Sequence, residues 1–306
     1  MRRAFADTLY RIGRENDRLV FLTGDLGFQV FDDFEREFPE RYLNVGVAEA
    51  QLVDCAAGLA LEGFRPVTYS IASFMTGRAF EQIRVAIGYH RLPVVVVGAG
   101  GGYTYASSGV THHAKEDAAL MALIPGMTVT LPGDPAEVET LLPQLVALPG
   151  PSYMRVGRFG EPRLDSATSI ELGKGRLLSD GAGIGILSTG GTAVPALAAV
   201  RRLQAEGKHP ALLHFHTLRP FDETALAALA GRVSHLVAVE DHGRQGGLAA
   251  TVADWLARTG SGLPLTYLGP GDELVLGNPH HDQLAQSRGY DAEGIATCCR
   301  SLWPAH

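Results

Sequence analysis

The feature that most constrains this fold is a regular alternation between short β-branched runs and segments with helical periodicity. The runs at 19–23, 66–69 and 93–98 are typical of strands, and the last is almost wholly apolar, as expected of a strand buried on both faces. Helical patterns at 48–61 and 77–88 separate them. Such alternation predicts an α/β fold, in which helices flank a mostly parallel sheet.

The alternation runs through the chain in two blocks. Further elements are expected as strands at 127–131, 152–156, 184–189, 211–215, 236–240 and 263–268, and as helices at 135–146, 193–205, 248–257 and 291–302. The stretch 161–182 has no clear period. We therefore predict two α/β domains, at 1–160 and 183–306, joined by a linker over 161–182.

Composition narrows the class of protein. A chain of 306 residues with 46% hydrophobic and 19% charged residues is typical of a globular protein. The net charge of −7 argues against a nucleic-acid-binding surface, and no apolar run is long enough to span a membrane. The N-terminus lacks the apolar core of a signal peptide, and Cys55, Cys298 and Cys299 match no metal or redox spacing. A reduced, cytoplasmic protein is expected.

Glu49 is the most informative single residue. It lies within 43–52, LNVGVAEAQL, among small and apolar neighbours, with no basic residue or metal ligand close by in the sequence. Desolvation of such a carboxylate would raise its pKa and let it hold a proton near neutral pH. The alternative is a glutamate stabilised by the dipole at the N-terminus of a helix. The segment alone leaves both interpretations open.

Several further segments occur in a definite order. They are 73–84 (SFMTGRAFEQIR), 109–117 (GVTHHAKED), 124–134 (IPGMTVTLPGD), 151–158 (PSYMRVGR), 217–222 (TLRPFD) and 239–248 (VEDHGRQGGL). Together with Glu49 they resemble the C-terminal half of transketolase and of 1-deoxy-xylulose-5-phosphate synthase, over nearly the whole chain. The resemblance implies a thiamine-diphosphate pyrimidine-binding domain followed by a transketolase C-terminal-like domain. In relatives this second domain supports dimerisation and takes little part in the chemistry.

The resemblance assigns cofactor-binding roles to four residues. Glu49 matches the glutamate that activates the aminopyrimidine ring of thiamine diphosphate. Phe74 matches the aromatic residue that stacks on that ring, although core packing would also explain a phenylalanine here. Ile71 is expected to line the same pocket. Asp25, at the end of a strand, is expected to be a polar contact near the thiazolium.

The resemblance also implies residues that contact the substrate. His112 matches a histidine that points at the substrate carbonyl or hydroxyl and shuttles protons, whereas adjacent His113 is expected to be a packed or surface residue. Arg158 matches an arginine that grips a substrate phosphate, and Arg78 is a weaker candidate for the same role; a surface ion pair or a solvated side chain is the alternative. Ser108 stands where relatives carry an aspartate that recognises a substrate hydroxyl, which predicts an unusual substrate.

One motif of these enzymes is absent. Relatives bind the diphosphate through Mg²⁺ with a Gly-Asp-Gly motif, and Gly24-Asp25-Leu26 does not match it. The chain also starts where the pyrimidine-binding domain starts. We therefore predict a split enzyme with no metal ligand in this chain. An N-terminal transketolase subunit would hold the diphosphate and Mg²⁺, the active site would form between the subunits, and the assembly would be an α2β2 heterotetramer.

The leading hypothesis is therefore transfer of a two-carbon ketol unit between sugar or sugar-phosphate-like substrates. A decarboxylating transferase, closer to deoxyxylulose-phosphate synthase or to the β subunit of 2-oxo-acid dehydrogenases, is the alternative. A non-catalytic subunit and a nucleotide-binding protein are further hypotheses. The glycine run at 98–102 suggests the last, but it lacks the full phosphate-binding fingerprint.

Overall fold

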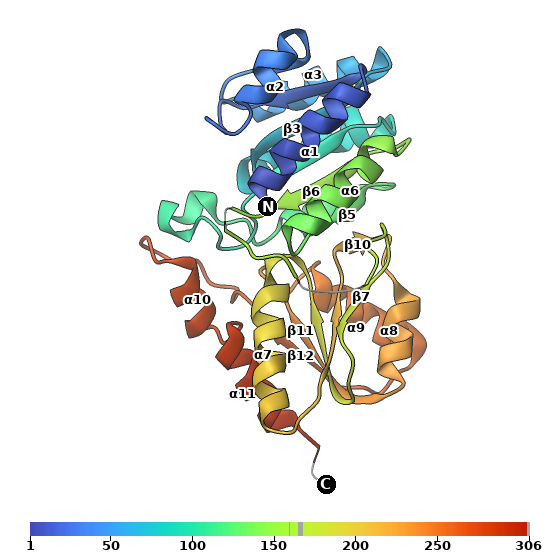
Figure 1. The fold of residues 1–306 in the computed structure, drawn as a ribbon, viewed down its shortest axis with the longest axis vertical. Helices are drawn as coiled ribbons and strands as arrows, with labels where there is room; N and C mark the ends of the chain where they lie inside the picture. The colour runs from blue at the N-terminus through green and yellow to red at the C-terminus, as the bar shows by residue number, and fades with distance from the viewer. Residues whose placement is uncertain (159, 165–167, 305–306) are drawn as a thin grey trace.

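The computed structural model describes residues 1–158, 160–164 and 168–304, which form two α/β domains stacked along the long axis (Figure 1). The first domain contains a seven-stranded sheet with the order β10-β5-β6-β4-β3-β1-β2. Every neighbouring pair is parallel except β10 and β5. The strands are β1 (Leu19–Thr23), β2 (Tyr42–Asn44), β3 (Arg65–Ile71), β4 (Val95–Ala99), β5 (Thr128–Thr130), β6 (Ser152–Val156) and β10 (Thr217–Arg219).

The second sheet has five strands in the order β12-β11-β8-β9-β7. Only the pair of β7 and β9 is antiparallel. The strands are β7 (Arg176–Ser179), β8 (Gly183–Ser188), β9 (Ala211–His214), β11 (Val233–Val239) and β12 (Leu265–Leu268). The predicted α/β class with mostly parallel sheets is therefore confirmed in both domains.

Helices cover both faces of the first sheet. Along β4, Val95 and Val97 contribute to one apolar cluster while Val96 contributes to another, because successive strand residues point to opposite faces. The first cluster includes residues of α1 (Arg2–Glu15) and α6 (Pro135–Ala147), which lie side by side in Figure 1. The second includes residues of α3 (Glu49–Leu61) and α5 (Asp117–Ala122). The short helix α2 (Asp32–Glu37) completes the domain at its top.

The helix predicted at 77–88 starts earlier than expected. Helical backbone runs from Ala72 to Tyr89, with wide π-type turns at Phe74–Arg78 and Ile83–Tyr89 around a short α4 (Phe80–Gln82). The sequence pattern missed its start because a period of 3.6 residues does not describe wide turns. This early start places Phe74 and Arg78 on a helical turn directly after β3.

The second domain is built in the same way. Helices α7 (Ala193–Ala205) and α11 (Ala292–Leu302) pack together and share one apolar cluster with β8 and β11, which also includes residues of α10 (His281–Ser287). Helices α8 (Glu223–Ala230) and α9 (Leu248–Thr259) contribute to a cluster that continues into the first domain. Within the described residues, no helix is both long and apolar enough to cross a lipid bilayer.

Two strands at the domain junction depart from the prediction. Residues 176–179, predicted as linker, form β7 and pair with β9. Residues 217–219 belong by sequence to the second domain, but as β10 they pair with β5 of the first sheet. Both strands are short edge strands, which leave little periodic pattern in a sequence. The two domains are thus joined by backbone hydrogen bonds as well as by apolar packing.

Glu240 is a buried carboxyl group at the end of β11. It accepts hydrogen bonds from the backbone amides of Leu248 (2.7 Å) and Ala249 (2.9 Å) at the start of α9. Burial raises the pKa of Glu240 to about 7, against the opposing effect of the two amides. The folded protein therefore binds the carboxyl proton of Glu240 more tightly than the unfolded chain does.

A pH dependence of stability follows from this shift. Glu240 should make the protein most stable below its unfolded pKa of 4.5, and this contribution, about 3 kcal/mol, should be lost as the pH rises towards 7. Urea unfolding of wild type and Glu240→Gln between about pH 5 and about pH 8 checks this. The unfolding free energy of Glu240→Gln should rise relative to that of wild type as the pH rises. A difference that stays constant with pH would contradict the prediction.

Candidate active site

The residues predicted to bind the cofactor gather at the carboxyl edge of the first sheet. Asp25 follows β1, Glu49 follows β2 and begins α3, and Ile71 and Phe74 lie at and just after the end of β3. The carboxyl ends of parallel strands meet at a single edge, which is where α/β proteins bind their ligands. Side chains from distant parts of the sequence are thereby brought together.

Glu49 is buried, with 1% of its surface exposed. Its Oε1 accepts a hydrogen bond from Ser70 Oγ of β3, and its Oε2 accepts one from Arg78 Nη1, each at 3.0 Å. The predicted burial is confirmed, and the fold supplies a basic partner that the neighbouring sequence lacks. The wide turn at 74–78 brings Arg78 against α3, although the arginine side chain stays 56% exposed.

Phe74 and His112 continue this cluster. Their ring centroids lie 5.0 Å apart in an edge-to-face arrangement, and the Arg78 guanidinium lies 5.4 Å from the centre of the Phe74 ring. Phe74 is only partly buried, so core packing alone does not explain this side chain. The structure therefore joins Glu49, Arg78, Phe74 and His112 in one continuous set of contacts, which we call the Glu49 cluster.

His112 belongs to the loop that follows β4. Its Nδ1 lies 3.0 Å from Thr111 Oγ1, and Ser73 Oγ donates to the carbonyl oxygen of Thr111 at 2.9 Å, which fastens the loop to the helical turn. Ser108 is exposed in the same loop. His113 is buried against Tyr103, with ring centroids 4.9 Å apart, which confirms that it is a packed residue.

Asp25 is held by a residue that the sequence did not single out. Asn44 Nδ2 donates to Asp25 Oδ1, while Asn44 Oδ1 accepts from the amides of Asp25 and Gly46, all at 3.0 Å. Asp25 has a left-handed backbone with φ of 57° and an exposed side chain. Asn44 thus ties together the ends of β1 and β2, which lie beside Ile71 and Glu49 at this edge.

Arg158 lies apart from the Glu49 cluster. It follows β6 and lines a cavity of about 830 Å³ between the two domains, whose lining includes Gly101, Thr104, Asp241 and His281 but not Glu49 or His112. Among the described residues, no hydrogen bond or ion pair is made by the Arg158 guanidinium. This cation is therefore open to a ligand in the cavity.

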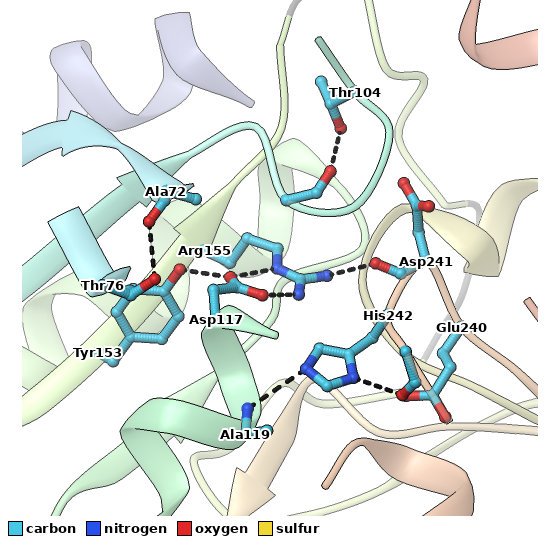
Figure 2. A network of polar contacts seen from close by, with 12 residues as sticks. Ala72, Thr76, Thr104, Asp117, Ala119, Tyr153, Arg155, Glu240, Asp241 and His242 are labelled. Carbon is cyan, nitrogen blue, oxygen red and sulfur yellow. Dashed lines mark hydrogen bonds and ion pairs between the residues drawn. The ribbon is translucent and has the colours of Figure 1, made fainter. Parts of the chain in front are cut away.

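Sequence reasoning also missed a buried ion pair beneath this cavity (Figure 2). Arg155 of β6 pairs with Asp117 of α5, and Arg155 Nε donates to Asp117 Oδ2 at 2.8 Å. Tyr153 Oη donates to the same oxygen at 2.5 Å. Burial alone would raise the pKa of Asp117, but the Arg155 charge outweighs it and holds that pKa below its usual value. Arg155 Nη1 also donates to the carbonyl oxygen of Asp241 in the second domain, at 3.1 Å.

Comparison with known proteins decides the family. A family model described as the transketolase pyrimidine-binding domain matches residues 1–159, more than half of the chain. This chain belongs to the transketolase family. A second model, the transketolase C-terminal domain, matches residues 173–295.

The relatives of this chain include proteins named as transketolase subunits. An apulose-4-phosphate transketolase subunit of Phocaeicola vulgatus is 33% identical, covering 96% of this chain and 94% of the relative. The 6-deoxy-6-sulfo-D-fructose transketolase subunit SqwH of Clostridium sp. (strain MSTE9) is 36% identical, covering 89% and 85%. A 1-deoxy-D-xylulose-5-phosphate synthase of Geobacter sulfurreducens is 34% identical over 98% of this chain, which spans only 48% of that relative.

The fold agrees with the sequence comparison. A solved structure described as a split gene transketolase in an inactive beta4 tetramer superposes with a TM-score of 0.87 at 32% identity, covering 98% of this chain and 96% of that one. The transketolase fold over both domains is therefore confirmed, as is the predicted likeness to a C-terminal transketolase subunit.

The residues of this transketolase chain fit an aminopyrimidine ring. Glu49 places a buried carboxylate at the open edge of the sheet, and the partly exposed Phe74 offers a flat apolar face on the adjoining turn. A carboxyl group can bond to a ring nitrogen while an aromatic face stacks on a planar heterocycle. Both groups are connected through Arg78, whose side chain is 56% exposed.

Proposed function

We propose that this chain is the pyrimidine-binding subunit of a two-subunit, thiamine-diphosphate-dependent transketolase. The observation that carries the proposal is the buried Glu49 carboxylate at the carboxyl edge of the sheet, in one contact set with Phe74 and His112. Buried carboxyl groups that serve as proton donors or acceptors are typical of catalytic sites.

Residues at this edge of the sheet have different tasks in this proposal. Thiamine diphosphate, when bound, supplies the nucleophilic carbon that takes up the two-carbon ketol unit. Glu49 holds and moves a proton at the pyrimidine ring, and Ser70 fixes the orientation of its carboxylate. Phe74 and Ile71 give the ring an apolar surface and exclude water. His112 donates a hydrogen bond to the substrate oxygen on which negative charge develops.

The proposed partner is an N-terminal subunit that carries the diphosphate and Mg²⁺ site, in an α2β2 assembly. Large apolar side chains on the loops after β1, β2 and β4 support it: Phe28 is 76% exposed, Val47 68% and Val110 43%. Exposed apolar groups around a site are typical of an interface. The names of two relatives also describe each of them as one subunit of a transketolase.

The proposed substrates are ketoses and aldoses that carry an anionic group. The Arg158 guanidinium, open to the cavity, suits a phosphate or sulfonate. The names of two split relatives refer to sugars with a phosphate or a sulfo group. Ser108 offers a hydroxyl in place of a carboxylate, so it can accept or donate a hydrogen bond to a substrate hydroxyl without a charge.

A decarboxylating reaction is the second candidate function. The likeness to a deoxyxylulose-phosphate synthase favours it, because that relative is 34% identical over 98% of this chain, a stretch that includes both domains. Product analysis separates the two reactions. Ketol transfer releases an aldose, whereas a 2-oxo acid donor releases CO₂, so release of CO₂ with each turnover would replace the first candidate by the second.

Calorimetric titration tests the split site. Thiamine diphosphate with Mg²⁺ is titrated into this chain alone, into the candidate partner from a neighbouring reading frame, and into their mixture. Tight binding in the mixture alone is expected, because the pyrimidine and diphosphate contacts would come from different chains. Equally tight binding by this chain alone would contradict the proposed division, and binding in none of the three would contradict the cofactor assignment.

Arg158→Met provides a test of the substrate class. Because the variant loses a charge-assisted hydrogen bond, its kcat/KM for a phosphorylated ketose should fall roughly 10- to 100-fold. A substrate without the phosphate should show little change. Arg163→Met is the matched control, since Arg163 is exposed and paired with Glu139. An equal fall in kcat/KM for both substrates would show that Arg158 does not recognise the anionic group.

A further inference from the structure

The loop that carries Ser108 and His112 is closed on itself. The amide of Gly102 donates to the carbonyl oxygen of Ala114 at 2.7 Å, and the amide of Ala114 donates back to Gly102 at 2.9 Å. Between these two residues the backbone turns repeatedly, with internal hydrogen bonds such as that from the His112 amide to Gly109 (3.0 Å). A loop whose ends lie close together and which makes its own internal contacts is a compact unit. We call its two paired ends, residues 102–103 and 114–115, the neck of the loop.

The first side of the neck, residues 102–103, contacts Asp241 of the second domain. The Tyr103 amide lies 3.2 Å from both carboxylate oxygens of Asp241. Gly102 has φ of 57°, and a Cβ there would overlap the Asp241 carboxylate, just as a Cβ on Gly101 would overlap Arg155. Glycine is therefore required for the neck to approach the second domain this closely.

The second side of the neck, residues 114–115, contacts the segment that contains Asp241. The Gly243 amide donates to the carbonyl oxygen of Lys115 at 2.7 Å, and Lys115 Nζ donates to the carbonyl oxygens of Gly271 (2.8 Å) and Glu273 (3.1 Å). Both ends of the loop are thus attached within residues 241–243, directly after β11.

Asp241 is itself held in place. Tyr290 Oη donates to its Oδ1 at 3.2 Å, and His281 Nε2 lies 3.3 Å from its Oδ2. Burial opposes protonation of His281, but its hydrogen bond with Asp241 outweighs this and raises the pKa of His281 to about 9. At neutral pH a histidinium therefore faces the Asp241 side chain, which also contacts the Tyr103 amide.

The contacts continue from Asp241 to the active site. Tyr103, whose amide meets Asp241, packs its ring against His113 inside the loop. The next side chain, His112, contacts Phe74 of the Glu49 cluster. We propose that Asp241 is a positioning residue, which sets the loop so that His112 and Ser108 face the substrate. The second domain then takes part in catalysis by holding this loop. The kinetic part of this inference rests on the proposed function, whereas the structural part does not.

Hydrogen exchange of this chain tests the structural half of the proposal. Asp241→Asn keeps the side-chain volume but weakens the charge-assisted bond, so exchange of the amides within 103–113 should quicken about tenfold or more. The amides of α3, which carries Glu49, should be unaffected. Asp282→Asn is the matched control, because Asp282 also contacts His281, at 3.2 Å, but is fully exposed and has no hydrogen bond or ion pair with the loop among the described residues. Equal exchange in the two variants, or faster exchange throughout the first domain, would overturn the proposal.

Kinetics of the assembled enzyme test the functional half. Asp241→Asn should lower kcat/KM for the sugar substrate about tenfold or more, while the Kd for thiamine diphosphate stays within about twofold, because Glu49 and Phe74 lie outside the loop. A loosened loop with unchanged kinetics, or a parallel loss of cofactor binding, would overturn the positioning role. A wild-type assembly without ketol transfer would instead show that the proposed function is wrong, and would leave the exchange result standing.

Tyr290→Phe keeps the proposal testable if Asp241→Asn fails to fold. This variant removes only the hydroxyl that donates to Asp241 Oδ1. A smaller increase in exchange, severalfold and confined to 103–113, is expected. Exchange identical to wild type across the loop would count against Asp241 as its anchor.

Discussion

Replacing Glu49 by glutamine should reduce ketol transfer by the assembled enzyme about 10²- to 10⁴-fold, the usual contribution of a positioned acid or base. Glutamine has the same size, and its amide oxygen can still accept a hydrogen bond from Ser70 or Arg78. It cannot hold and release a proton near neutral pH. Steady-state turnover in the complex with the partner subunit measures the effect, and circular dichroism checks that the fold is kept.

Glu62→Gln is the matched control for this experiment. Glu62 is exposed at the C-terminal end of α3, the helix that Glu49 begins, so the two variants make the same chemical change at opposite ends of one helix. Turnover of Glu62→Gln should equal that of wild type. Unchanged turnover in Glu49→Gln would refute the catalytic assignment and leave the non-catalytic subunit as the better interpretation.

Local patterns predicted the elements whose burial follows one simple period. Helix α7 begins and ends at the predicted residues, and α3 differs by one residue at its start. The strand at 93–98 was found because both of its faces are buried and its sequence is accordingly apolar. Helix α1 was missed although Phe5, Leu9 and Ile12 have helical spacing and are buried, so a signal was present there.

Residues that meet across the fold left no such signal. Asp117 and Arg155 are 38 positions apart, and Asp241 is 138 positions from Tyr103. Their meeting depends on strand order and on the docking of the two domains, which no local period encodes. The Glu49 cluster was predicted through family resemblance, whereas the pairing of Glu49 with Arg78 depends on a wide helical turn that the resemblance did not contain.

Arg155→Met should be more destabilising than any of the other substitutions, at about 3–5 kcal/mol, because it leaves a buried carboxylate without its partner. Asp117 is fully buried, and after the substitution the Tyr153 hydroxyl and the neighbouring His242 would remain to favour its charge, without the hydrogen-bonded cation. The variant also loses the hydrogen bond from Arg155 to Asp241 between the domains. Urea unfolding at neutral pH measures the change, and Arg163→Met, which breaks an exposed pair with Glu139, should cost about 0–1 kcal/mol.

The pH dependence of this loss identifies its cause. In the wild type the pKa of Asp117 is held below its unfolded value, so its contribution is present above that value and is lost as the pH falls. Without Arg155, burial becomes the dominant influence and raises the pKa of Asp117. At a pH where the unfolded chain carries an ionised Asp117, folding of the variant must then bury an unpaired charge or take up a proton, and either event costs stability. The difference in unfolding free energy between wild type and Arg155→Met should therefore narrow as the pH falls below the pKa of Asp117 in the unfolded chain.

The double variant Asp117→Asn/Arg155→Met separates an unpaired charge from lost packing. It should recover part of the lost stability at neutral pH, since no uncompensated charge remains. A gap independent of pH, with no recovery in the double variant, would mean that lost packing rather than an unpaired carboxylate accounts for the destabilisation.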